Sequence, residues 1–298
     1  MEKLAAVLVV TYNRVNLLKE NIESLLSQTR SDFDIYIIDN ASNDGTDELV
    51  KSYMNDSDNI FYYNTGSNLG GAGGFSYGLK IIYQKNYRYC WIMDDDTVPL
   101  KQAYESLVNK ANILKDEFSF LCSYVKWIDG KLCNMNIPGV KRELFSKFDL
   151  LEEHLLFVKT ASFVSLFINM SIAKNVGLPI KEFFIYGDDC EYTLRLSKVK
   201  PGYWDFDSVV VHKMARNANV DIVTEHTDRL DRHYYNIRNL TYIAKKYGKD
   251  GIPVFLLRTV GDFFRVIFCS KSLKMRRLKI ICKGLFAGIV FNPSIEKQ

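Results

Sequence analysis

The stretch Tyr89-Cys90-Trp91-Ile92-Met93-Asp94-Asp95-Asp96-Thr97 joins a short apolar run directly to three consecutive carboxylates. The run has the length and residue types of a buried strand, so the acids would stand at its carboxyl end. In an open α/β sheet, ligands bind at that end of the strands. Adjacent carboxylates raise one another's pKa unless a cation is near. A divalent metal that holds a diphosphate would supply one, although a solvated acidic turn explains the same residues.

Strand and helix patterns alternate through residues 1–125 of the chain. Strands separated by helices indicate right-handed βαβ units, and therefore an α/β fold with a mostly parallel central sheet flanked by helices. Two further strands are predicted beyond this region. The predicted strands are residues 5–10, 34–38, 60–63, 89–93, 159–168 and 208–212.

Polar residues follow the first three strands and would meet at one edge of the sheet. Thr11 and Arg14 follow the first strand, Asp39 ends the second, and the loop from Asn68 to Gly74 follows the third. An arginine can face a phosphate, and Asp39 can accept the imide N–H of uracil or thymine. The glycine-rich loop lets a ligand approach the backbone and precedes a helix whose N-terminus favours anions. A plain loop with a helix cap is the alternative.

A second acidic cluster, Asp188 and Asp189, stands at the start of a predicted helix. Two interpretations are open for it. Either carboxylate would cap the helix, or one of them is a general base that deprotonates an acceptor hydroxyl. His212 ends the strand over residues 208–212, where it would complete a metal site with the acids or have a structural role.

Composition is that of a globular protein, with 298 residues of which 47% are hydrophobic and 25% charged. The six cysteines have no metal-binding or paired spacing, which predicts a reducing, cytoplasmic environment. Charge is uneven, because residues 245–298 hold 12 Lys+Arg against 3 Asp+Glu, while the rest of the chain holds 27 against 32. Since the basic charge is confined to an apolar tail, nucleic-acid binding is not expected.

Residues 226–298 mix apolar and basic residues at helical spacing, and no charge-free run reaches the ~20 residues of a spanning helix. We therefore expect one domain over residues 1–225 and a helical extension over residues 226–298. Basic amphipathic helices are typical of proteins that lie on the inner, anionic face of a membrane. Packing against the body or against a second copy of the chain is the alternative.

Taken together, these motifs resemble those of family 2 glycosyltransferases with the GT-A fold, in consistent order over residues 4–240. Within the family, the glycine loop and the triple Asp followed by Thr look most like bacterial galactofuranosyltransferases, which implies UDP-galactofuranose as donor. A rhamnosyltransferase that uses dTDP-rhamnose is the alternative. The motifs that carry the resemblance are residues 9–14, 39–42, 68–74, 94–97, 187–192 and His212.

The resemblance also implies roles for individual residues. Asp96 and His212 would hold Mn²⁺ or Mg²⁺ together with the diphosphate. Asp189 would be the base of an inverting displacement, and Asp188 would orient the acceptor. The implied donor-binding residues are Thr11, Arg14, Asp39, Asn68, Gly73, Asp94 and Asp95.

Such an enzyme would act on a glycan or lipid-linked acceptor in bacterial surface polysaccharide synthesis. Galactofuranosyltransferases that extend long polymers place tryptophans where this chain has Thr160-Ala161-Ser162-Phe163, so we expect single addition. A catalytically inactive nucleotide-sugar-binding scaffold is the rival of another class, and the intact acids Asp94, Asp96 and Asp189 argue against it. A nucleotidyltransferase would want a basic glycine-rich loop near the first strand, which is absent from the sequence.

Overall fold

The computed structural model describes residues 3–140, 149–248 and 252–297. The strands are β1 (Ala5–Thr11), β2 (Phe33–Asp39), β3 (Ile60–Asn64), β4 (Tyr89–Asp94), β5 (Thr97–Pro99), β6 (Phe120–Trp127), β7 (Gly139–Val140), β8 (Leu155–Thr160), β9 (Leu166–Asn169) and β10 (Gly202–His212). The helices are α1 (Val15–Leu26), α2 (Thr46–Asp56), α3 (Gly70–Tyr83), α4 (Ala103–Ile113), α5 (Asp149–Glu152), α6 (Met170–Val176), α7 (Asp188–Leu196), α8 (Arg232–Tyr247), α9 (Ile252–Cys269) and α10 (Lys274–Val290).

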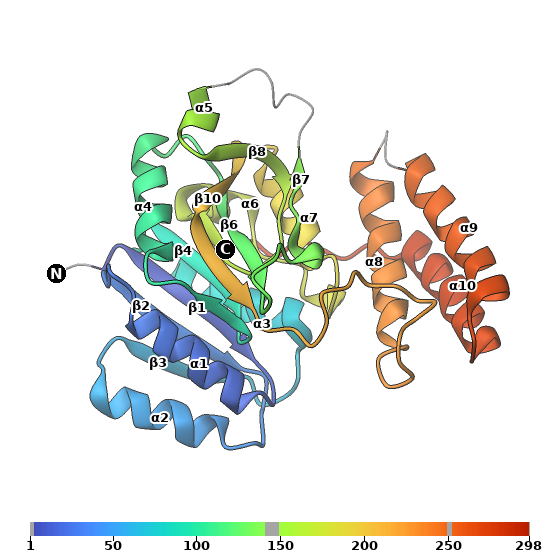
Figure 1. Ribbon diagram of the computed structural model, residues 1–298, viewed down its shortest axis with the longest axis horizontal. Helices are drawn as coiled ribbons and strands as arrows, with labels where there is room; N and C mark the ends of the chain where they lie inside the picture. The colour runs from blue at the N-terminus through green and yellow to red at the C-terminus, as the bar shows by residue number, and fades with distance from the viewer. Residues whose placement is uncertain (1–2, 141–148, 249–251, 298) are drawn as a thin grey trace.

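The described strands form one sheet in the order β3-β2-β1-β4-β9-β6-β10-β8-β7, with β5 paired to β10 (Figure 1). β1 pairs in parallel with β2 and β4, and β2 with β3, as predicted for the first part of the chain. Beyond β4 the sheet is mixed, because β9 runs antiparallel to both β4 and β6. In this register Thr11 lies beside Asp39, and Val10 beside Asp94. The polar strand ends therefore share one edge.

The sheet is buried on both faces. Alternate residues of β1 point to opposite sides, so one set packs against α1, α2 and α4 and the other against α3 and α6. Gly74 and Gly78 allow α3 to lie close to the sheet. A Cβ added at Gly78 would stand 2.3 Å from Leu8 Cδ1, and one at Gly74 would stand 2.6 Å from Val10 Cγ1. This tight packing fixes the start of α3 over the carboxyl end of β1.

The single strand predicted over residues 159–168 is wrong. β8 and β9 are separate strands, and the chain between them turns at Ser165, which has a positive φ of 64°. The turn is held by long-range hydrogen bonds, since Trp91 Nε1 donates to Ser165 Oγ at 2.8 Å and Ser123 Oγ lies 2.6 Å from the same atom. Hydrogen bonds from residues distant in sequence therefore separate β8 from β9, although the apolar sequence pattern continues between them.

The C-terminal helices α8, α9 and α10 lie side by side at one end of the molecule (Figure 1). They share an apolar cluster that includes Ile222, Ile237, Val266 and Ile281, separate from the clusters of the sheet. α8 also packs on the body, because Tyr242 and Ile243 share a cluster with Ala72 and Phe183, and the division near residue 225 stays a prediction. The first of these helices begins at Arg232, later than the predicted 226, because residues 221–231 form turns. Among the described residues, none of the helices is long and apolar enough to cross a membrane.

Candidate functional site

A cavity of about 270 Å³ opens at the carboxyl ends of β1 and β4. Five of the predicted donor-binding residues line it, namely Thr11, Arg14, Asn68, Asp94 and Asp95. Asn68 also fixes the start of α3, because its Oδ1 accepts a hydrogen bond from Gly70 N at 2.9 Å. The cavity is also lined by Val10, Tyr12, Asn40, Gly70, Gly71, Phe184, Ile185 and Arg232.

Arg14 supplies a cation to the first acidic cluster. Its Nη1 donates to Asp96 Oδ2 at 2.6 Å and to Asp95 Oδ1 at 3.2 Å, while Thr11 Oγ1 donates to Asp95 Oδ2 at 2.8 Å. Thr11 and Arg14 were predicted to hold the uridine. In this structure their side-chain bonds go to the acids, and binding of the uridine by them stays a prediction.

The three acids of the cluster differ in charge state. Burial, with the charge of Asp96, raises the pKa of Asp94 to about 7, and burial raises the pKa of Asp95 to about 6. Burial would also raise the pKa of Asp96, but hydrogen bonds and charges from His212 and Arg14 outweigh it and lower that pKa below its usual value. Asp96 is therefore the acid held most firmly as a carboxylate, as a metal ligand requires.

The ring nitrogen Nε2 of His212, which would be the metal ligand, faces Asp96. Its Nε2 lies 3.1 Å from Asp96 Oδ1, and its Nδ1 lies 2.8 Å from Asn136 Oδ1. Because the amide oxygen of Asn136 accepts from Nδ1–H, the neutral ring keeps its lone pair on Nε2. Burial alone would lower the pKa of His212, but Asp96 raises it to about 10. The imidazole thus takes the place of a cation beside the carboxylate.

The pair Asp96 and His212 fits a divalent cation. Asp96 Oδ1 is buried and lies 3.1 Å from His212 Nε2, so a cation that replaced the proton on Nε2 would meet a carboxylate oxygen and a ring nitrogen together. Within those residues no group of three or more His, Cys, Asp or Glu is arranged to hold a metal ion. A cation on Asp96 and His212 would therefore complete its coordination with diphosphate oxygens and water, as Mg²⁺ and Mn²⁺ commonly do.

Asn136 is a site residue that the sequence did not reveal. It lies in a short 3₁₀ turn, Asn134–Asn136, within the segment of residues 126–157 that has weak strand and helix patterns. Its side chain is buried, and its Nδ2 donates to Ser162 Oγ at 2.9 Å. That second hydrogen bond orients the amide so that its oxygen faces His212. Nothing in the local pattern distinguishes this asparagine from those around it.

The second acidic cluster opens α7, but neither acid caps the helix as one interpretation predicted. Gly187, with a φ of 81°, occupies the N-cap position and makes no side-chain cap bond, so Asp188 and Asp189 lie in the first helical turn. Burial, then the charge of Asp189, raise the pKa of Asp188 well above its usual range, and the charge of Asp94 adds to the effect. Burial raises the pKa of Asp189 to about 6. The two acidic clusters therefore face each other closely enough to interact.

The loop that presents Asp188 and Asp189 is held from two sides. The buried Asn239 of α8 donates through Nδ2 to the carbonyls of Phe183, Ile185 and Tyr186, at 3.0, 3.1 and 2.7 Å. On the other side, a Cβ added at Gly70 would stand 2.2 Å from Phe184 O. The start of α3 and the loop before α7 are therefore in direct contact beside the cavity.

Two predicted donor-binding residues do not line the cavity. Asp39 is fully buried and its oxygens accept from Ser42 N, Ser42 Oγ and Tyr62 OH, at 2.9, 2.6 and 2.6 Å. Gly73 is not a loop residue but lies inside α3, where a Cβ would stand 2.6 Å from Leu69 Cβ. The glycine-rich stretch thus serves helix packing more than ligand approach, and Gly71 is the member with open space around its Cβ position.

Comparison with known proteins gives a consistent result. The model of the family described as Glycosyl transferase family 2 matches residues 6–158. A GalNAc(5)-diNAcBac-PP-undecaprenol beta-1,3-glucosyltransferase from Campylobacter jejuni is 34% identical over 113 residues, which are 38% of this chain and 35% of the relative. A galactofuranosyltransferase from Mycolicibacterium smegmatis is 33% identical over 91 residues, 30% of this chain and 29% of the relative.

The fold is shared with solved glycosyltransferase structures. The crystal structure of GalNAc-T7 with UDP, GalNAc and Mn²⁺ superposes with a TM-score of 0.62 at 13% identity, covering 94% of this chain and 54% of that one. The similarity at this identity concerns the fold, which is GT-A as the sequence motifs implied. The chain spans less than two thirds of the length of the curated relatives that it matches.

Proposed function

The chain belongs to glycosyl transferase family 2, and on that premise we propose that it transfers a sugar from a nucleoside diphosphate donor to a hydroxyl group of a glycan. The observation that carries this proposal is a pair of acidic clusters beside one cavity, of which Asp94 and Asp95 line it, while Asp188 and Asp189 follow the lining residues Phe184 and Ile185. One cluster is paired with Arg14 and His212, and the other, Asp188 and Asp189, has no ion pair among the described residues. A charge-compensated site suits a diphosphate, and an uncompensated carboxylate suits a proton acceptor.

In the proposed reaction Asp189 is the base. An acceptor hydroxyl positioned by Asp188 attacks the anomeric carbon of the donor sugar, while Asp189 takes its proton. The bond from the anomeric carbon to the diphosphate oxygen breaks in the same displacement, which inverts the anomeric centre. Its pKa of about 6 leaves Asp189 largely ionised at neutral pH and more basic than an ordinary aspartate. This carries over what the family resemblance implied for the two residues.

The diphosphate end of the donor would lie against Asp94–Asp96, with Asn68 and the start of α3 beside it. A cation held by Asp96 and His212 would offset the negative charge that develops on the leaving diphosphate. Arg232, which lines the same cavity, is a further candidate for a phosphate contact. The helix dipole at the N-terminus of α3 has the right sign for an anion.

For the sugar we propose galactofuranose, delivered as UDP-galactofuranose. The support is the glycine loop, the triple Asp followed by Thr, and the partial similarity to a galactofuranosyltransferase. The acceptor is proposed to be a lipid-linked glycan of a bacterial surface polysaccharide, since a relative of 34% identity acts on an undecaprenol-linked saccharide by its name. The enzyme would then work at the inner face of the plasma membrane. Rhamnose from dTDP-rhamnose is the second candidate, because rhamnosyltransferases are related to galactofuranosyltransferases, although they usually have a different residue between the two acids.

Calorimetric titration of the full chain with UDP, dTDP and GDP, each with and without Mn²⁺, tests the donor site. We expect UDP to bind, and to bind more tightly with Mn²⁺. UDP-galactofuranose is then tried as the donor. Preference for dTDP would replace galactofuranose by rhamnose. Absence of binding to all three nucleotides would contradict the enzyme and favour an inactive scaffold.

A further inference from the structure

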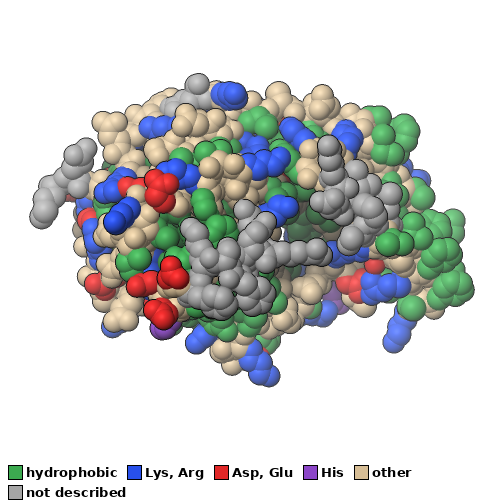
Figure 2. Space-filling model, turned by 90° about the horizontal axis from the view of Figure 1, so that it is seen from above, with side chains coloured by type: hydrophobic (Ala, Val, Ile, Leu, Met, Phe, Trp, Pro, Cys, Tyr) green, Lys and Arg blue, Asp and Glu red, His purple; other side chains and the backbone are tan. Residues whose placement is uncertain are grey.

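The exposed apolar side chains of this chain are concentrated on two helices. Ten large apolar side chains are more than half exposed in the described residues, and only Ile128 and Val199 lie outside α9 and α10. The four on α9 recur at helical spacing and form one stripe. Figure 2 shows apolar side chains gathered at this end of the molecule, with basic ones beside them. The eight residues are Leu257, Val260, Phe264, Phe268, Met275, Phe286, Ile289 and Val290.

Part of the basic charge of the same region has no acidic partner, although Arg265 pairs with Asp221 and Arg276 with Asp231. Both described acids of residues 252–297 are occupied, since Asp262 pairs with Arg265 and Glu296 pairs with Lys80 on the body. Five exposed basic side chains on and between α9 and α10 have no ion-pair partner among the described residues. They are Arg258, Lys271, Lys274, Lys279 and Lys283. The net positive charge of the tail is therefore presented to the surroundings, not neutralised within the fold.

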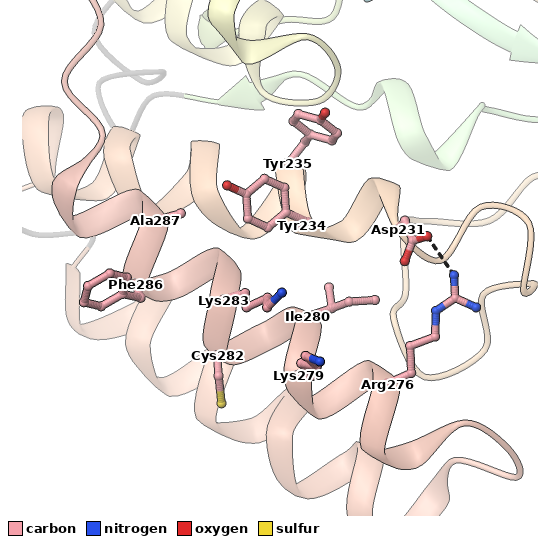
Figure 3. A pocket seen from close by; sticks show the side chains of 10 residues that line it. All are labelled: Asp231, Tyr234, Tyr235, Arg276, Lys279, Ile280, Cys282, Lys283, Phe286 and Ala287. Carbon is pink, nitrogen blue, oxygen red and sulfur yellow. Dashed lines mark hydrogen bonds and ion pairs between the residues drawn. The ribbon is translucent and has the colours of Figure 1, made fainter.

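A groove of about 910 Å³ between α8 and α10 combines both properties (Figure 3). Tyr234 and Tyr235 line it from α8, and Lys279, Lys283 and Phe286 line it from α10. The groove also adjoins the site described above. The ring of Tyr235 packs 5.1 Å from that of Phe184, which lines the donor cavity. A ligand bound at this groove would thus lie close to the donor cavity.

We propose that the docking face, meaning the exposed apolar side chains of α9 and α10 together with the lysines of the α8–α10 groove, binds an anionic phospholipid bilayer. Apolar side chains would enter the interface while lysines contact lipid phosphates. A second copy of this chain is a poorer occupant. A two-fold contact brings the same patch together from both subunits, so the uncompensated lysines would face each other. The inference rests on the proposed function only for its biological purpose, because bilayer binding is measured without donor or acceptor.

Vesicle sedimentation of the full chain tests the docking face, with phosphatidylcholine alone and with phosphatidylglycerol added. We expect binding only when the anionic lipid is present, weakened by salt. Lys279→Glu with Lys283→Glu should lower vesicle partitioning by about fivefold or more for each lysine. Phe264→Glu with Phe268→Glu should lower it by about tenfold for each phenylalanine. Met54→Glu and Lys51→Glu, on the exposed surface of α2, are the matched controls and should leave binding unchanged.

Two results would overturn the docking face. Equal binding to vesicles with and without anionic lipid would show that the lysines do not contribute to binding through lipid charge. A dimer by light scattering that becomes a monomer in the Phe264→Glu, Phe268→Glu variant would assign the face to a second copy of the chain. Unchanged thermal unfolding and UDP binding of each variant establish that the body is intact, so loss of vesicle binding is separable from loss of the donor site.

Discussion

The two acidic clusters of the cavity differ in what surrounds their charge. Asp95 and Asp96 receive hydrogen bonds from Thr11 and Arg14, and Asp96 also faces His212. Asp188 and Asp189, at the start of α7, have no ion pair among the described residues and accept local backbone bonds, such as that from Cys190 N to Asp189 Oδ1. Burial raises the pKa of most of these acids, and Asp96 differs from them because the cations Arg14 and His212 lower its pKa.

The difference teaches how one cavity can serve two kinds of chemistry. Asp96, bonded to Arg14 and facing His212, has a lowered pKa and stays ionised, so it can hold a metal, whereas Asp189 has a raised pKa and can exchange protons near neutral pH. The separation also explains why the clusters come from different parts of the chain. Asp94–Asp96 end a sheet strand, and Asp188–Asp189 begin a helix that α8 and α3 hold in place. Each of the following experiments tests one side of this comparison.

Asp189→Asn should have the largest effect. The amide cannot accept the acceptor proton, so we expect kcat to fall by about 10²–10⁴-fold, with UDP binding unchanged by calorimetry. Asp188→Asn is the comparator, because it alters the same helical turn and should change the KM of the acceptor more than kcat. Turnover close to that of the unsubstituted protein in Asp189→Asn would show that the base is elsewhere.

Asn136→Ala should weaken metal binding at Asp96 and His212. Without the amide oxygen the His212 ring loses its orientation and its preferred tautomer, and we expect Mn²⁺ affinity to fall by about 10–100-fold. The measurement is Mn²⁺ binding followed by electron paramagnetic resonance in the presence of UDP. Asn134→Ala, an exposed neighbour in the same turn, is the control and should retain affinity. Equal Mn²⁺ affinity in the two variants would show that Asn136 does not position His212.

The pH dependence of sugar transfer should reflect the ionisation of Asp188 and Asp189. A base with a pKa of about 6 is protonated below that value, so kcat should fall by about tenfold per pH unit as pH drops under 6. Asp188 interacts with Asp189, so the measured pKa belongs to the pair. The profile is recorded with saturating donor and Mn²⁺, and a flat profile down to pH 5 would contradict the assignment of the base.

The pH dependence of stability should have opposite signs for Asp189 and Asp96. The folded-state pKa of Asp189 is raised, so the folded protein binds more protons and this group loses stability as pH rises through the interval up to about 6. The folded-state pKa of Asp96 is lowered, so its contribution is present above the usual aspartate pKa and is lost on acidification. Urea unfolding of Asp189→Asn across this range separates the two, because the variant should lack only the first effect.

The sequence predicted the parts of the fold that depend on local pattern. The strands β1 to β4 and the start of α7 follow from apolar runs and turn residues, and their polar ends meet as expected. The sequence could not predict which residues form hydrogen bonds over long sequence distances. The bonds from Arg14 to Asp95 and Asp96, and from Asn239 to the loop before α7, join residues more than fifty positions apart. Neither side chain carries a local pattern that identifies its partner.

The glycine-rich start of α3 sets limits on how the donor pocket can be redesigned. Gly70 and Gly74 are closed to larger residues, because an added Cβ would overlap Phe184 O or Val10 Cγ1. Gly71 lines the cavity, and nothing lies within 4 Å of its Cβ position. A library of side chains at residue 71 alone would therefore reshape the pocket without disturbing α3 or the loop that precedes α7. One adjustable position on a rigid frame gives an engineer a place to alter which sugar is accepted.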